Sequence, residues 1–265
     1  MKSSIDIQEF YRGLDDIYKR NSKTEAMPYM EGWLRKAHEL EDTSGVIAVS
    51  NELGGYCRVT GDTDRAMKLY EDVLRRLENM GLGKSEHYAT ALINTGDVFI
   101  NAGEPLKALP YFLRARDMLA DCGLAGDYRM AALCNNISMV YRETGEFDKA
   151  ERALDIAFNI IKGLPQYRGE LATTYINLGE LQVRQGKLEM AKESFAAACR
   201  MFEEDGGGDV HYSSACAGLG QVYYLKGQKQ EAEKLYQKAL DLIERDFGKT
   251  EYYRLVEKSL MKVRM

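Results

Sequence analysis

The side chains most able to bind a metal ion or act as a nucleophile are few and scattered. No two cysteines form a CxxC pair, and four of the five lie at apolar positions of helical patterns, which indicates small core residues. None of the three histidines lies four residues from another or near a cysteine, so the spacing predicts no metal site. The cysteines are Cys57, Cys122, Cys134, Cys199 and Cys216, and the histidines are His38, His87 and His211.

Catalytic patterns are also missing from the sequence. An enzyme of the common classes needs a nucleophile beside a base, or two carboxylates placed together, and no motif of either kind occurs. We therefore predict that the protein is not an enzyme, with no catalytic residues and no cofactor.

Composition limits the partners and the compartment. Hydrophobic residues make up 45% of the 265 positions, which is enough for a sizeable core. The formal net charge of -5 and the absence of a Lys/Arg-rich block argue against nucleic acid as a partner. No leader-like segment and no run of about 18 apolar residues is visible, so we expect a cytoplasmic protein with no membrane partner.

One short pattern recurs along the chain and defines its organisation. A glycine is followed five residues later by an alanine in "TGDTDRA", "AGEPLKA", "TGEFDKA", "QGKLEMA" and "KGQKQEA". The glycines Gly61, Gly103, Gly145, Gly186 and Gly227 are separated by steps of 42, 42, 41 and 41 residues. A further step of 40 residues back from Ala66 reaches Ala26, with Asn21 in place of the glycine, because asparagine also tolerates positive φ. The sequence therefore predicts six repeats.

Each repeat predicts two antiparallel helices joined at the glycine. Apolar residues recur at helical spacing before and after it, and a small residue precedes each turn glycine by seven positions. We expect close helix–helix contact at these small residues, with the recurring alanine on the facing surface. The small residues are Gly54, Gly96, Ser138, Gly179 and Gly220.

The pattern resembles the tetratricopeptide repeat over nearly the whole chain. In "NNISMVYRETGEFDKAERAL" the characteristic positions hold Ile137, Ser138, Tyr141, Gly145, Ala150 and Leu154. The longer period of about 42 residues is similar to the repeats of kinesin light chains, and so is the pair Asn135-Asn136. The resemblance implies an all-α fold: a right-handed α-solenoid of about six helical hairpins plus a C-terminal capping helix. We expect one superhelical domain over residues 1–265, with a diverged repeat at 1–42, five clear repeats at 43–248 and the capping helix at 249–265.

In this family the first helix of each repeat lines a concave groove, and the repeat positions identify groove residues here. Asparagine holds the same position in three consecutive repeats, as Asn94, Asn136 and Asn177, and an amide both donates to and accepts from an extended peptide backbone. Asparagine at this position equally serves contacts between neighbouring helices, so the sequence leaves both roles open. The remaining predicted peptide-binding residues are Asn51, Asn135, Arg58, Arg142, Arg184 and Tyr224.

Two functions of different classes remain. The resemblance favours a non-enzymatic scaffold that holds an extended segment of a partner protein or peptide in the groove, with the arginines selecting acidic side chains. The alternative is a structural or assembly subunit that oligomerises through repeat edges and terminal helices, which leaves a homo-oligomer open. The sequence does not name the partner.

Overall fold

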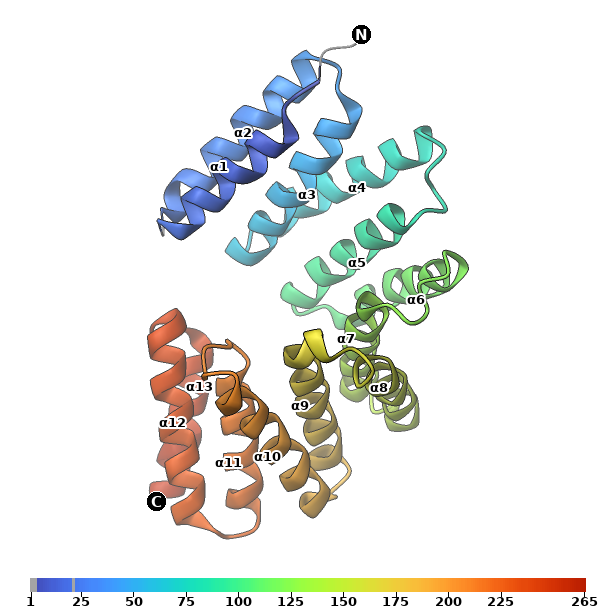
Figure 1. Ribbon diagram of the computed structural model, residues 1–265. Helices are drawn as coiled ribbons and strands as arrows, with labels where there is room; N and C mark the ends of the chain where they lie inside the picture. The colour runs from blue at the N-terminus through green and yellow to red at the C-terminus, as the bar shows by residue number, and fades with distance from the viewer. Residues whose placement is uncertain (1–3, 21) are drawn as a thin grey trace. The chain divides into compact units, whose positions relative to one another are not determined.

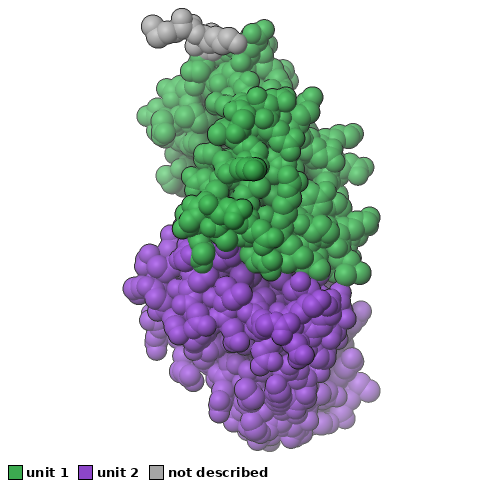
Figure 2. Space-filling model, turned by 90° about the vertical axis from the view of Figure 1, so that its right-hand side faces the viewer, with its two compact units in different colours: residues 1–125 green, residues 126–265 purple. Residues whose placement is uncertain are grey.

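A computed structural model describes residues 4–20 and 22–265, and all regular structure in these ranges is helical (Figure 1). The chain divides into two compact units, residues 1–125 and 126–265, called unit 1 and unit 2 below (Figure 2). Unit 1 contains three helical hairpins. Its helices are α1 (Ile7–Lys19), α2 (Lys23–Glu39), α3 (Thr43–Thr60), α4 (Thr63–Asn79), α5 (Glu86–Asn101) and α6 (Pro105–Asp121).

Unit 2 contains three further hairpins and a terminal helix, and a short 3-10 helix, η1 (Pro165–Tyr167), precedes its second hairpin. In every hairpin of both units, the first helix packs against the second. The α-helices of unit 2 are α7 (Tyr128–Glu143), α8 (Phe147–Ile161), α9 (Arg168–Arg184), α10 (Leu188–Glu204), α11 (Tyr212–Leu225), α12 (Lys229–Phe247) and α13 (Glu251–Arg264).

The five repeat glycines end the first helix of their hairpins in the left-handed conformation, with φ between 73° and 84°. A side chain is strained there, which explains why glycine recurs. At Gly61, the amide donates to the Arg58 carbonyl, and the next amide, that of Asp62, donates to the Cys57 carbonyl. These two bonds close the helix and turn the chain towards its antiparallel partner.

The small residues of the first helices make room for a ring of the second helix. A Cβ built on Gly96 would lie 2.3 Å from the Phe112 ring, and one on Gly179 would lie 2.8 Å from the Phe195 ring. We expected the repeat alanine to face the small residue. Instead, the ring four residues after that alanine fills the space at the small residue. The repeat that carries Ser138 has Leu154 instead of a ring at the equivalent position, and this smaller side chain accommodates the serine. All five repeat alanines are fully buried.

The last helix, α13, closes the core of unit 2. Val256, Leu260 and Val263 are each at most 4% exposed, and Tyr253 packs against the same cluster. Four of the five cysteines are buried, and only Cys122 is exposed.

The all-α solenoid of helical hairpins with a final capping helix is therefore confirmed for the described residues. That residues 1–265 form a single superhelical domain stays a prediction. Asn21, the expected counterpart of the repeat glycines, lies outside the described residues.

Candidate binding groove

The first helices of unit 2 line a cavity of about 450 Å³, called the central cavity below. Asn136 and Arg142 enter its wall from α7, and Asn177 and Glu180 from α9. The structure thus brings two of the three equivalent asparagines to one cavity. Their helical hairpins are consecutive, so the repeat itself places the same side chain type twice along the wall.

Two further cavities share residues with the central cavity. The terminal cavity, about 390 Å³, lies among α9, α11 and α13 and shares Glu180 and Ser214 with it. The loop cavity, about 510 Å³, lies at the start of α9 and the loop before α11, and shares Glu170, Thr173 and His211 with it. The terminal and loop cavities thus both adjoin the central cavity, and the three together are called the unit 2 groove below.

The two neighbouring asparagines of α7 have different roles. Asn136 is half-buried in the central cavity, whereas Asn135 is only 3% exposed and its Nδ2 donates to Thr174 Oγ1 of α9 at 3.0 Å. The Asn135 Oδ1 is buried and accepts no hydrogen bond from the described residues. Asn135 therefore joins two repeats through its nitrogen, which leaves one unused acceptor at the wall of the cavity.

The predicted arginines are engaged by carboxylates of the groove. Arg142, whose side chain is 10% exposed, forms ion pairs with Glu180 of the next repeat and, at 3.5 Å, with Glu143. Arg184 pairs with the same Glu143 at 3.3 Å. Burial raises the pKa of Glu180, and the Arg142 charge opposes that rise. Much of the arginine charge is thus balanced within the protein, and the selection of acidic partners by Arg142 and Arg184 stays a prediction.

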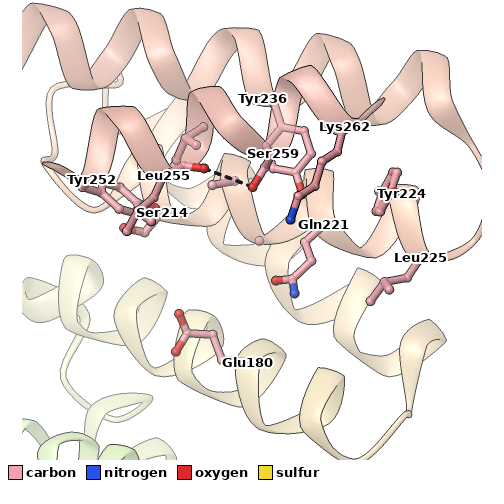
Figure 3. A pocket seen from close by; sticks show the side chains of 13 residues that line it. Glu180, Ser214, Gln221, Tyr224, Leu225, Tyr236, Tyr252, Leu255, Ser259 and Lys262 are labelled. Atoms are coloured by element: carbon pink, nitrogen blue, oxygen red, sulfur yellow. Dashed lines mark hydrogen bonds between the residues drawn. The ribbon is translucent and has the colours of Figure 1, made fainter. Parts of the chain in front are cut away.

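Residues of the terminal cavity extend the groove onto the last helix (Figure 3). Tyr224 of α11, a predicted site residue, is 37% exposed there. Figure 3 shows Glu180 and Lys262 pointing into this cavity from α9 and α13, with Gln221 of α11 between them.

Sequence reasoning missed the α13 residues of this cavity, because it treated the helix only as a cover for the core. The signal was available: a second stripe at helical spacing lies one position before the buried stripe. Tyr252 and Leu255 of this stripe are 39% and 54% exposed. The full stripe is Tyr252, Leu255, Ser259 and Lys262.

The three predicted site residues of unit 1 lie on the first helices of their hairpins, Asn51 and Arg58 on α3 and Asn94 on α5. The Asn51 Oδ1 and the Arg58 Nε are buried and have no hydrogen-bond partner among the described residues. Burial raises the pKa of Asp97 on α5 to about 6, and the nearby Arg58 charge opposes this rise. Asn94 is half-buried, as are its counterparts in unit 2.

In residues 4–20 and 22–265, no group of three or more His, Cys, Asp or Glu side chains has a geometry suited to a metal ion. Within the same ranges, none of the helices combines the length and the apolar character that crossing a bilayer requires.

Comparisons with known proteins agree with the repeat pattern. Residues 128–204 and 213–246 match family models described as tetratricopeptide repeat. A curated relative, lipopolysaccharide assembly protein B of Escherichia coli (strain K12), is 25% identical over 202 residues, which cover 76% of this chain and 46% of the relative. The chain thus spans about half the length of the curated relatives it matches.

Solved structures show the same fold. The apo form of the quorum sensor NprR from B. thuringiensis has a TM-score of 0.71 at 15% identity, over 100% of this chain and 72% of that one. A Podospora anserina putative kinesin light chain with nearly identical TPR-like repeats has a TM-score of 0.60 at 15% identity, over 74% of this chain and 93% of that one.

Proposed function

Since the chain is built of tetratricopeptide repeats, a fold that commonly binds other proteins, we propose that it is a non-enzymatic scaffold whose unit 2 groove holds an extended segment of a partner protein. One observation carries the proposal: Asn136 and Asn177, from consecutive repeats, line one cavity together with the unused acceptor of Asn135. We propose a cytoplasmic location, as expected from the sequence.

The chemistry of this wall suits a polypeptide backbone. Each asparagine amide offers two donors and one acceptor group, and an extended backbone presents both at regular intervals. A net gain of ~0.5–1.5 kcal/mol per hydrogen bond means that the two asparagines supply only part of a micromolar affinity. The exposed rings and aliphatic groups of Tyr224, Tyr252 and Leu255 in the terminal cavity can supply the rest through burial of apolar surface.

The alternative of an oligomerising assembly subunit receives no specific support from the described residues. Trp33, the single tryptophan of the sequence, is partly buried and packs against the core cluster of unit 1 rather than presenting an assembly surface. The exposed face of α13 is part of the groove wall. A homo-oligomer is accordingly not part of the proposal.

The test is a selection of random decapeptides on the purified protein, followed by titration calorimetry of the best peptide. The double variant Asn136→Ala/Asn177→Ala should bind it roughly fivefold to a hundredfold more weakly, from the loss of two hydrogen bonds at the per-bond figure above. The matched control is Asn159→Ala, an exposed asparagine on α8 outside the groove cavities.

Adding Asn94→Ala to the double variant tests whether unit 1 takes part in binding the same peptide. Equal affinities of the wild type and the folded double variant would exclude Asn136 and Asn177 as contacts and contradict the proposal. Light scattering of the free protein shows in parallel whether it is a monomer.

A further inference from the structure

The unit 2 groove carries opposite charges at its two ends, and neither the Glu170 carboxylate nor the Lys262 ammonium forms an ion pair or hydrogen bond with the described residues. At the loop cavity, burial raises the pKa of Glu170, the nearby His211 charge opposes this rise, and the charge of Asp209 adds to it. Within the described part of the chain, the Glu170 carboxylate makes no hydrogen bond or ion pair. Asp209 Oδ1 accepts only the local backbone amide of His211, at 2.8 Å.

The terminal cavity instead has an unpaired positive charge in its lining. Its charged lining residues are Glu180 and Lys262, and Glu180 is already paired with Arg142. No carboxylate among the described residues lies within ion-pair distance of the Lys262 Nζ, which points into the cavity (Figure 3). One positive charge therefore remains available at this end.

An unpartnered polar group between the two ends points to a ligand. Asn135 lines the same central cavity as Glu170 and is only 3% exposed, and its buried Oδ1 accepts no hydrogen bond from the described residues. A buried carbonyl oxygen without a donor is unfavourable, and an N–H of a bound backbone supplies that donor.

We propose that the groove fixes the direction of the bound segment through its charges: an ammonium group of the partner lies at Glu170 and Asp209, and an acidic side chain lies at Lys262. This inference rests on the proposed function and names the chemistry of its ligand. Glu170 lines the loop cavity and Glu180 lines the terminal cavity that also holds Lys262, and these two α9 positions lie about 15 Å apart along the helix at 1.5 Å per residue. An extended chain covers that distance in about five residues.

Charge exchange at each end tests the proposal. Decapeptides with acetylated and amidated ends, randomised at all positions, are selected on the wild type, on Glu170→Lys and on Lys262→Glu. The wild type should enrich a basic residue about five positions from an acidic one, in one order only. Each variant should bind the wild-type peptide at least tenfold more weakly. It should lose the charge preference at its own end of the groove and keep the preference at the other end. The double exchange should favour the reversed order of charges.

Matched controls separate local from general charge effects. Glu193→Lys on α10 and Lys258→Glu on α13 change exposed residues outside the groove cavities, and both should retain the wild-type preference. A second set of peptides with free amino termini shows whether the ammonium group comes from a lysine or from the end of the chain, because only in the latter case does acetylation abolish binding.

The outcomes distinguish this inference from the proposed function. Selected peptides that depend on Asn136 and Asn177 but show no ordered charges, or whose charge preference survives both exchanges, overturn the inference and leave the groove function standing. Failure of the folded wild type to enrich any peptide from either set, with blocked or free amino termini, overturns both.

Discussion

At the residue scale, the surroundings decide what a groove side chain can do. Asn135 and Asn136 are adjacent in sequence and both line the central cavity, yet Asn135 is only 3% exposed and its amide nitrogen donates to Thr174, whereas Asn136 is half-buried. Arg142 and Arg184 face carboxylates of their own protein. The residue type at a repeat position thus identifies a side chain that could contact a ligand. The neighbours of that side chain on the next helix determine whether it is available to do so.

Asp97 on α5 leads to a prediction on pH dependence. Its pKa in the folded state is about 6, above the value of 3.8 expected when unfolded, so the folded protein binds this proton more tightly. Its contribution to the free energy of unfolding is therefore full below pH ~4 and is lost as the pH rises through 6. At 1.36 kcal/mol per pKa unit, the change amounts to about 3 kcal/mol at most.

The measurement is urea denaturation of the wild type and of Asp97→Asn between pH 4 and pH 8. The difference between the two curves isolates this group from other carboxylates that titrate in the same range. Wild-type stability should fall relative to the variant as the pH rises. Parallel curves over the whole range would show that Asp97 titrates alike in the folded and unfolded states.

At the scale of the helix pair, a small residue and a ring act together. The Phe112 ring leaves no space for a side chain at position 96, as it would contact a Cβ at 2.3 Å. The pair Ser138 and Leu154 holds the equivalent positions in another repeat, which indicates that the two positions vary together. Either pair fills the space between the helices, but a serine opposite a ring overfills it.

We expect Gly96→Ser to destabilise unit 1 by about 1–3 kcal/mol, because overpacking forces the ring and the helices apart. The second substitution Phe112→Leu should recover part of this loss by recreating the pair found at 138 and 154. Denaturation midpoints of the two single variants and the double variant form the test. Strictly additive losses would show that the two positions do not share one space.

At the scale of the whole molecule, packing is between neighbours: within each unit, a helix contacts mainly the other helix of its hairpin and the helices of the adjacent hairpin. Stability in such an array is a sum of terms from each repeat and from the interfaces between neighbours. Local openings can therefore occur in one hairpin while distant hairpins remain folded.

Hydrogen exchange of Gly96→Ser tests this locality. Amide exchange should rise in α5 and α6, and in the adjacent α3 and α4, roughly fivefold to a hundredfold for a loss of about 1–3 kcal/mol, while α11–α13 keep the wild-type rates. Equal acceleration in all helices would instead indicate global unfolding as a single cooperative unit.

The sequence alone determined the helical hairpins, their number and their register. These features follow from local rules: glycine is needed where φ is positive, and apolar spacing identifies the buried face of each helix. It also placed Asn136 and Asn177 at equivalent positions, and the structure brings both to one cavity. Their role in binding stays a prediction.

Only the tertiary structure decided which of these side chains are available and how far the groove of unit 2 extends. Burial of Asn135, the ion pairs of Arg142 and Arg184, and the second face of α13 all depend on contacts between helices from different repeats. A repeat pattern specifies each hairpin by itself. Whether Glu170 and Lys262 find an ion-pair partner depends on distances across the interface between neighbouring hairpins. Their lack of such a partner therefore follows only from how the hairpins stack.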